Sequence, residues 1–252
     1  MKNNQINILV KKILKNKWKI ITIDELKKIL QNLEQTNIYK KIYYLKNRWY
    51  LISLKKDLFF VKEPDQNIDE EEIIEKFYWK ILHKYLKNNY WNNYFIWWVK
   101  ALEFWNNNFS IPEKITIINP FKRSTETILK WKKVFNTLYK IKYFEPEKSF
   151  KYFKKQTEKI TIDNKNFIIA NYELSLLESL YSPSFLEQKY IEELVKKNIR
   201  KNSKKINLDV FEYFLKIWKY WEPCKRLYEI ASKIKPDFAE KLKKLLLKWY
   251  WL

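Results

Sequence analysis

The sequence predicts an α+β protein in which a small N-terminal domain of three helices and a β-hairpin precedes a larger mixed α/β domain that ends in a helical bundle. Three observations support this prediction. Apolar residues recur at helical spacing three times before residue 48, a short hairpin pattern follows, and five helical segments fill the C-terminal third. The length of 252 residues exceeds the usual size of one domain, and the hydrophobic content of 46% is enough for two cores.

The first two helices are predicted from their apolar spacing and from one capping signal. Residues Gln5–Leu14 place apolar side chains on one helical face. The second helix begins at Thr22, which has Glu25 three residues later, the spacing of a capping box. We expect this helix to end near Leu33.

A third helix and a hairpin complete the N-terminal domain. The helix spans Thr36–Asn47, and its apolar face consists of Ile38, Ile42 and Leu45. Two apolar runs, residues 50–54 and 58–61, flank a polar turn and read as a β-hairpin. Three helices followed by a hairpin are typical of a winged helix-turn-helix, here predicted for residues 1–62.

The remaining chain is predicted as an acidic linker, residues 63–72, and a second domain, residues 73–252. The predicted strands of this domain are residues 115–118, 140–144, 160–162 and 167–170. The predicted helices are residues 71–86, 94–105, 173–180, 185–199, 208–218, 224–234 and 237–247.

Composition restricts the compartment and the partners. The formal charge of +22 favours polyanions such as nucleic acid, although an AT-rich genome can also raise the lysine content. A single cysteine, Cys224, and no Cys/His cluster argue against disulfides, structural zinc and other cofactors. No apolar stretch is long enough for a signal peptide or a membrane span. We therefore expect a soluble cytoplasmic protein without a membrane partner.

Glycine is absent, whereas tryptophan occurs 12 times. An average chain of this length would carry roughly 18 glycines. Trp49, between a helix and a strand, and Trp18, at a helix end, occupy places where glycine is expected. The same holds for Trp97, Trp98, Trp218 and Trp221. We expect that the source organism reads UGA as glycine, and that several of these tryptophans have positive φ; the alternatives are a naturally Trp-rich protein and a deliberately glycine-free sequence.

The third helix carries the residues that fit DNA contact. In a helix-turn-helix, the second helix of the motif lies in the major groove. Thr36 and Asn37 begin this helix, where a phosphate and an adenine edge can be bound, and we expect Lys40, Lys41 and Tyr44 to share its outward face. The complete predicted set of DNA contacts is Thr36, Asn37, Lys40, Lys41, Tyr44, Lys46 and Arg48 from the helix, and Lys55 and Lys56 from the hairpin tip.

Three segments resemble the AbiEi-type antitoxins, the transcription regulators of a bacterial toxin–antitoxin and phage-exclusion system. These segments are Lys17–Val61, Tyr94–Ile118 with its Ala-Leu-Glu run before Ile111-Pro112, and Ile168–Leu177, which lacks the Pro and Arg of the family pattern. Several tryptophans fall on glycines of the family. The resemblance implies an autorepressor that binds inverted repeats in double-stranded DNA at its own promoter. It also implies a C-terminal domain that counters a nucleotidyltransferase toxin, without implying direct contact with that toxin.

No catalytic or metal-binding pattern is found, so we expect no enzymatic activity. Glycine-rich phosphate loops are absent even if every Trp is read as Gly. For a metal-dependent nuclease, Asp163 lies in a turn and Glu145–Lys148 lacks an acidic partner. His83 and Cys224 are expected to pack rather than react. The alternatives to a repressor and antitoxin are a winged-helix interaction module, a regulator without a toxin partner and, less favoured, that nuclease.

Overall fold

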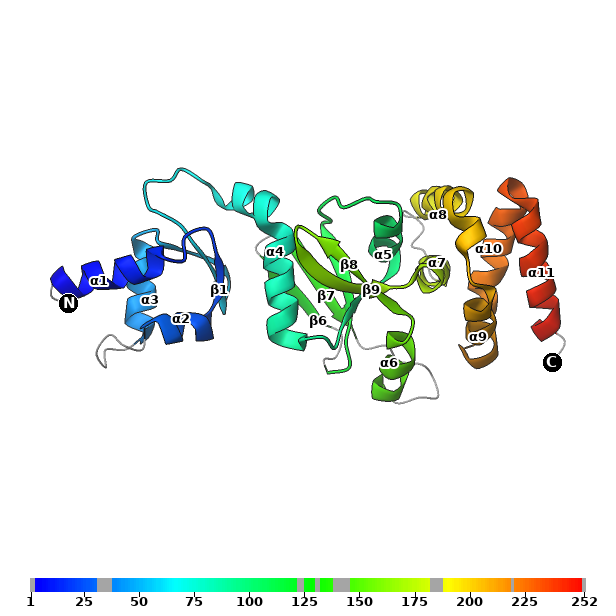
Figure 1. The fold of residues 1–252 in the computed structure, drawn as a ribbon, viewed down its shortest axis with the longest axis horizontal. Helices are drawn as coiled ribbons and strands as arrows, with labels where there is room; N and C mark the ends of the chain where they lie inside the picture. Colours follow the sequence, from blue (N-terminus) through cyan, green and yellow to red (C-terminus); the bar gives the residue numbers. More distant parts are fainter. Residues whose placement is uncertain are drawn as a thin grey trace. The chain divides into compact units, whose positions relative to one another are not determined.

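The computed structural model describes residues 3–30, 38–121, 125–129, 132–137, 146–181, 188–218 and 220–250. The fold is mixed α+β, as predicted, with two sheets and a helical C-terminal region (Figure 1). The chain divides into two compact units. Unit 1 comprises Met1–Asn92, Thr127–Lys133 and Asp163–Lys165, and unit 2 comprises the rest.

Unit 1 begins with three helices and a three-stranded sheet. Its elements are α1 (Asn3–Leu14), β1 (Ile20–Thr22), α2 (Ile23–Leu30), α3 (Ile38–Asn47), β2 (Leu51–Lys55), β3 (Leu58–Val61) and α4 (Glu70–Tyr90). The sheet is antiparallel in the order β1-β3-β2, and Phe60 of β3 pairs with both Ile20 and Ile52. The predicted hairpin is therefore present, and β1, only three residues long, was not predicted. Residues 31–37, which include the predicted end of the second helix and the start of the third, lie outside the described residues.

The helices of unit 1 bury the apolar positions that predicted them. Leu9 of α1, Leu26 of α2 and Leu45 of α3 are each 0% exposed. They belong to one core that also includes residues of the sheet, such as Leu51 and Phe59. Burial of each such side chain contributes about 1.5–3 kcal/mol, so this core fixes which face of each helix remains outside.

The predicted capping box at the start of α2 is confirmed. The Glu25 backbone N–H donates to Thr22 Oγ1 at 3.2 Å, and the Thr22 N–H donates to Glu25 Oε2 at 2.8 Å. Lys84 Nζ of α4 donates to the other oxygen, Glu25 Oε1, at 2.5 Å. Burial alone would raise the pKa of Glu25, but the hydrogen bonds from Lys84 and Thr22 outweigh it and the net pKa is lowered. The ionised carboxylate therefore favours the folded state.

Replacing Glu25 by Gln is expected to destabilise unit 1 by about 0.5 kcal/mol at pH 7, because the amide can keep the capping hydrogen bond from Thr22 but loses the negative charge that faces Lys84. The pKa of Glu25 is lower in the folded state than in the unfolded state, where it is near 4.5. The stabilisation of the folded state by the ionised Glu25 carboxylate is therefore present above pH 4.5 and is lost as the pH falls through the folded-state pKa. Chemical denaturation at pH 7 and at pH 3 should show a larger difference between Glu25→Gln and the wild-type protein at pH 7 than at pH 3. The neighbouring change Asp24→Asn, at an exposed residue, is the control, and an equal loss at both pH values would contradict the prediction.

The boundary of unit 1 lies later than the predicted one at residue 62. The Phe77 ring of α4 lies 5.1 Å from Phe60 and 6.1 Å from Trp18, so α4 packs on the small sheet. Lys62 Nζ donates to the carbonyl oxygens of Gln66 at 2.7 Å and Ile68 at 3.4 Å, which ties down the predicted linker. The apolar face of α4 explains why the unit extends to Asn92.

Unit 2 contains most of the residues of a six-stranded sheet, together with the remaining helices. The strands are β4 (Phe95–Ile96), β5 (Lys114–Ile118), β6 (Thr125–Leu129), β7 (Lys132–Thr137), β8 (Thr157–Ile162) and β9 (Lys165–Ala170), in the order β6-β7-β5-β4-β9-β8. The helices are α5 (Trp98–Trp105), α6 (Pro146–Lys154), α7 (Tyr172–Tyr181), α8 (Gln188–Asn202), a 3₁₀ turn (Ser203–Lys205), α9 (Leu208–Trp218), α10 (Trp221–Ile234) and α11 (Pro236–Tyr250). Central β4 pairs antiparallel with β5 and parallel with β9.

Several sequence expectations for unit 2 need correction. The predicted helix 94–105 is wrong in its first part, because Phe95 and Ile96 form a strand that pairs with Ile118 and Ile117. The strands β6 and β7 and helix α6 were not predicted. The predicted strand 140–144 and the start of the predicted helix 185–199 lie outside the described residues. The hairpin around the turn at Asp163 and Asn164 is confirmed, and both residues have positive φ.

Positive φ at tryptophan is confirmed. Among the described residues, Trp18, Trp49, Trp91 and Trp98 have φ of 63°, 61°, 56° and 64°. Trp97, expected to behave similarly, has φ of −125°. For a residue with a Cβ atom, this left-handed backbone conformation costs about 1–2 kcal/mol, whereas glycine adopts it without that cost.

The end of α3 shows why such a conformation is needed. The Trp49 N–H donates to the Lys46 carbonyl at 3.0 Å, and the Tyr50 N–H donates to the Leu45 carbonyl at 2.9 Å. This pair of bonds is the Schellman motif, whose C′ residue is left-handed and usually glycine. Tyr50 packs against the core that holds Leu45, and this apolar contact commonly accompanies the motif.

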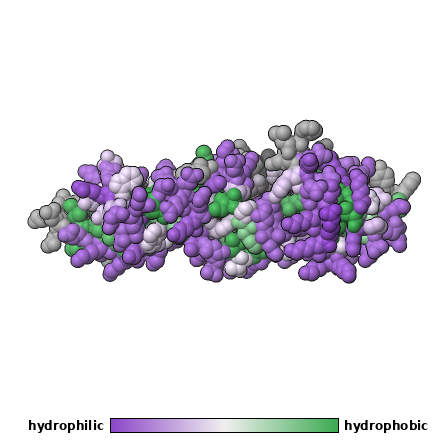
Figure 2. Space-filling model, turned by 90° about the horizontal axis from the view of Figure 1, so that it is seen from above, coloured by the Kyte–Doolittle hydropathy of each residue, from purple (hydrophilic) through white to green (hydrophobic). Residues whose placement is uncertain are grey.

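The surface is predominantly polar, in line with a charged content of 32%. On the face drawn in Figure 2, hydrophilic residues cover most of the area and hydrophobic residues form scattered patches. No helix within the described ranges combines the length and the hydropathy needed to cross a bilayer.

Candidate nucleic-acid interface

The outward face of α3 combines exposed tyrosines with basic and amide side chains. Tyr39 is 62% exposed and Tyr43 is 67% exposed. Lys40, Lys46 and Asn47 are also exposed. The opposite face of the same helix is fixed in the core of unit 1, so these five side chains are held outward by the burial of their neighbours.

Two of the predicted contact residues do not lie on this face. Lys41 is 3% exposed, so its predicted outward orientation is wrong. It lies four residues before Leu45 and three after Ile38, and both spacings place it on the core side of a helix. Tyr44 is half-buried and packs against the core, with the Arg48 guanidinium carbon 5.8 Å from its ring centroid. The exposed tyrosines were missed, although the same helical period would have located them.

The remaining predicted contacts divide between the helix and the hairpin. Arg48 is exposed at the end of α3. Lys56 is exposed in the β2–β3 turn, whereas Lys55 is half-buried with its Nζ atom 4.7 Å above the Tyr85 ring of α4. Lys55 therefore braces the hairpin against α4, and Lys56 is the cation at the tip. The predicted residues Thr36 and Asn37 lie outside the described part of the chain.

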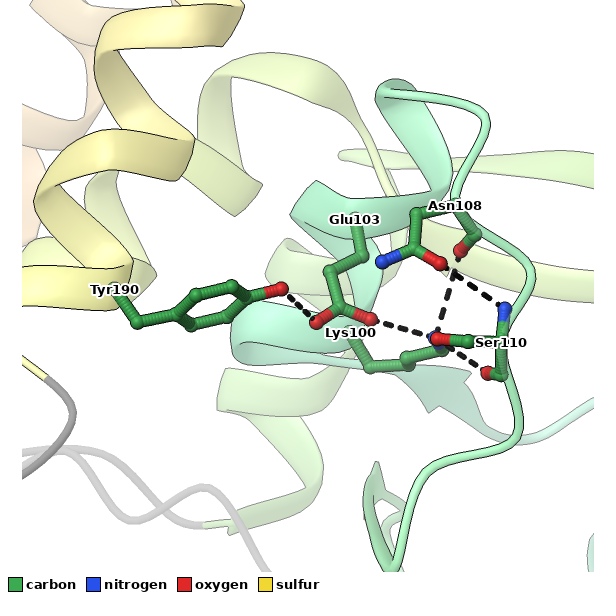
Figure 3. A network of polar contacts seen from close by, with 5 residues as sticks. All are labelled: Lys100, Glu103, Asn108, Ser110 and Tyr190. Carbon is green, nitrogen blue, oxygen red and sulfur yellow. Dashed lines mark hydrogen bonds and ion pairs between the residues drawn. The ribbon is translucent and has the colours of Figure 1, made fainter.

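Unit 2 contains a buried ion pair that the sequence did not indicate (Figure 3). Lys100 and Glu103, one turn apart on α5, have side chains that are 5% and 13% exposed, with Nζ and Oε2 2.6 Å apart. Lys100 also donates to the carbonyl oxygens of Ser110 at 2.7 Å and Asn108 at 3.4 Å. Tyr190 of α8 donates to the other oxygen of Glu103 at 2.5 Å.

This network is a structural clamp. Burial lowers the pKa of Lys100, but the hydrogen bond and the charge of Glu103 oppose that effect. The oxygens of Glu103, Asn108 and Ser110 engage the Lys100 ammonium, which leaves it poorly suited to attack a substrate. The clamp joins α5, the loop that follows it and α8. A cavity of about 280 Å³ lies beside it and is lined by Trp97, Trp98, Val99, Lys100, Glu103, Pro112, Glu113, Lys114, Thr116, Tyr190 and Ile191.

The two reactive side chains singled out in the sequence, Cys224 and His83, both have shifted pKa values. Burial raises the pKa of the Cys224 thiol to about 12, so the thiol stays protonated at neutral pH. Partial burial, together with Lys165, Lys87 and Lys84, lowers the pKa of His83. Across the described segments, no group of three or more His, Cys, Asp and Glu residues is placed to hold a metal ion.

Comparison with known proteins supports the fold. No family model and no curated protein matches the chain. The chain is similar to a solved structure, that of the RV2827C protein from Mycobacterium tuberculosis, with a TM-score of 0.60 and 10% sequence identity. The match covers 96% of this chain and 81% of that chain. At 10% sequence identity this similarity shows a shared fold, and it gives no information about the function of this chain.

Proposed function

We propose that this protein is a sequence-specific DNA-binding transcription regulator whose α3 lies in the major groove. The observation that carries the proposal is the exposed face of α3, where Tyr39, Lys40, Tyr43, Lys46 and Asn47 project from a helix held rigidly by the core behind it. Such a face offers cations to phosphates and amide and aromatic groups to base edges. The net charge of +22 favours the same polyanionic partner.

The element order of unit 1 supports a winged-helix assignment. The order α1-β1-α2-α3-β2-β3, with a sheet arranged β1-β3-β2, places a helix pair before a hairpin. In this assignment α3 is the recognition helix and the β2–β3 hairpin is the wing. Lys56 at the hairpin tip is then placed to contact the DNA backbone.

The resemblance to AbiEi-type antitoxins extends the proposal to a biological role. On that basis the protein represses its own promoter at inverted repeats, and its C-terminal domain counters a nucleotidyltransferase toxin. Co-expression tests this role. A nucleotidyltransferase encoded beside the gene should arrest growth when it is expressed alone. Cells that express it together with the full chain should grow, and growth arrest in both cases would contradict the antitoxin role.

DNA binding is tested with two duplexes of equal length and composition. One carries the region upstream of the gene, and the other carries the same bases in shuffled order. Fluorescence anisotropy with the full chain should show tighter binding to the upstream duplex, typically by three or more orders of magnitude for a specific regulator. Equal affinity for both duplexes would contradict sequence-specific recognition.

A protein-interaction module is the second candidate, and the exposed tyrosines favour it, since Tyr is enriched in protein interfaces. The two candidates differ in their response to salt. Binding to DNA releases counterions, so its affinity falls steeply with salt concentration, whereas an interface centred on aromatic rings responds weakly.

A further inference from the structure

We propose that Tyr39 and Tyr43 read the methyl groups of thymine, so that α3 selects A·T-rich sequence in the major groove. This inference rests on the proposed DNA-binding function and names the bases it recognises. The two tyrosines are 62% and 67% exposed and lie four residues apart on the outward face. Because the other face of this short helix is packed in the core, the two exposed rings are accessible for contact with a partner surface.

The spacing of the two rings fits the spacing of base pairs. Residues four apart on a helix are separated by about 6 Å along its axis, since each residue rises 1.5 Å. Successive bases on one strand are about 3.4 Å apart, so the two rings reach positions about two base pairs apart. Lys40 lies between them in sequence and is exposed, which allows it to hold a phosphate while the rings enter the groove.

The chemistry of the rings selects thymine. In the major groove, thymine is the base that presents an apolar group, the C5 methyl, and apolar side chains contact it. The edge of a tyrosine ring carries only C–H groups, which can contact a methyl group. Guanine and cytosine offer only hydrogen-bonding atoms at their major-groove edges, which a ring edge would desolvate without compensation.

The test removes the methyl group from the DNA and the rings from the protein. The upstream duplex is prepared with deoxyuridine in place of thymidine, which keeps base pairing and deletes each methyl group. Wild-type protein should bind this duplex about tenfold more weakly if two methyl groups are lost from contact. The Tyr39→Ala/Tyr43→Ala variant should bind both duplexes equally weakly, and the Tyr39→Phe/Tyr43→Phe variant should keep the discrimination.

A matched control and the contrary outcomes separate this inference from the function on which it rests. Tyr152, 39% exposed in unit 2, is the control, and Tyr152→Ala should leave discrimination unchanged. If wild-type protein prefers the upstream over the shuffled duplex but ignores the methyl groups, the thymine inference is overturned and the DNA-binding function stands. If it prefers neither, the proposed function itself fails. Discrimination retained by the alanine variant would also overturn the inference.

A second inference rests on a different observation. We infer that Trp18, Trp49, Trp91 and Trp98 occupy positions at which the natural protein carries glycine. All four have positive φ, and the other described residues with positive φ are Asn107, Asp163 and Asn164, which belong to the two types that tolerate it best. Trp49 and Trp91 are 61% and 64% exposed, so burial in a core does not explain a tryptophan at either position.

The helix ends give the inference its structural detail. Trp91 follows α4 as its C-cap residue, and its N–H donates to the Lys87 carbonyl at 3.1 Å. Asn107 follows α5 in the same kind of turn that Trp49 makes after α3, with the N–H of Asn107 bonded to the Phe104 carbonyl at 2.9 Å. Helix ends of this type take glycine first and asparagine next. A codon read as Trp in one genetic code and as Gly in another accounts for both the absence of glycine and the surplus of tryptophan.

The codons and the natural protein decide this inference. The gene should carry TGA at positions 18, 49, 91 and 98, and peptides from the source cells should have the mass of glycine there. TGG codons, or peptides with the mass of tryptophan, would overturn it.

Stability gives an independent readout of the same inference. Trp49→Gly should raise the melting temperature of unit 1 by about 5 °C, because it relieves the left-handed strain at an exposed residue. Trp79→Gly, at a 9%-exposed position inside α4, should lower the melting temperature and serves as the control. A lower melting temperature for Trp49→Gly would contradict the assignment of position 49.

Discussion

Replacing Lys40, Lys46 and Lys56 together by alanine is expected to weaken binding to the upstream duplex about a hundredfold. All three side chains are exposed in unit 1, on α3 and at the hairpin tip. Each is expected to hold one phosphate, and a net contribution of about 1 kcal/mol per contact gives about 3 kcal/mol in total. Fluorescence anisotropy at low salt measures the change.

A variant with the same loss of charge elsewhere provides the control. Lys225, Lys241 and Lys244 are exposed on α10 and α11 of unit 2, and their replacement by alanine removes the same three charges. This control should bind within a few fold of the wild-type protein if the charge acts locally. An equal loss of affinity in both variants would show that net charge, and not the α3 face, carries the binding.

Breaking the buried ion pair of unit 2 is expected to have the largest effect on stability. Lys100→Met leaves Glu103, whose side chain is 13% exposed, with the Tyr190 hydroxyl but without its cation. Leaving one charge of a buried pair uncompensated costs about 3–5 kcal/mol. Urea denaturation should therefore show a much lower midpoint for Lys100→Met, with affinity for DNA unchanged after refolding.

The double variant and a surface pair make this prediction specific. In Lys100→Met/Glu103→Leu both charges are gone, so the loss should be well below the sum of the two single losses. Lys196 pairs with Glu192 at 2.9 Å and Glu193 at 2.8 Å on the surface of α8, and Lys196→Met should change the midpoint little. Additive losses at positions 100 and 103 would contradict the account of a coupled clamp.

The N-terminal helices and the hairpin could be predicted because their signals are local. The capping box of Thr22 and Glu25 and the apolar spacing of α3 each lie within one or two helical turns, and the structure contains both. The six-stranded sheet was harder, because β6 and β7 carry no clear alternation and β4 is only two residues long. Its position depends on pairing with residues far along the chain, such as Ile96 with Ile169.

The predicted outward orientation was wrong for two of the proposed contact residues, Lys41 and Tyr44. Lys41 was expected to face solvent, but helix geometry places it on the same side as Leu45, and the residue is 3% exposed. Tyr39 and Tyr43 were missed, although the helical period that places Ile42 inward places both tyrosines outside the buried face. The clamp at Lys100 depends on α8, which is almost 90 residues away in sequence, so no local pattern indicates it.

The salt dependence of DNA binding tests the central claim most directly. The logarithm of the binding constant for the upstream duplex is measured against the logarithm of salt concentration, for the wild-type protein and for the Lys40, Lys46 and Lys56 alanine variant. Each phosphate contact contributes a slope of about −0.9, so the variant should have a slope shallower by about 2.7. Identical slopes would contradict the claim that the exposed face of α3 and the hairpin tip bind the DNA backbone.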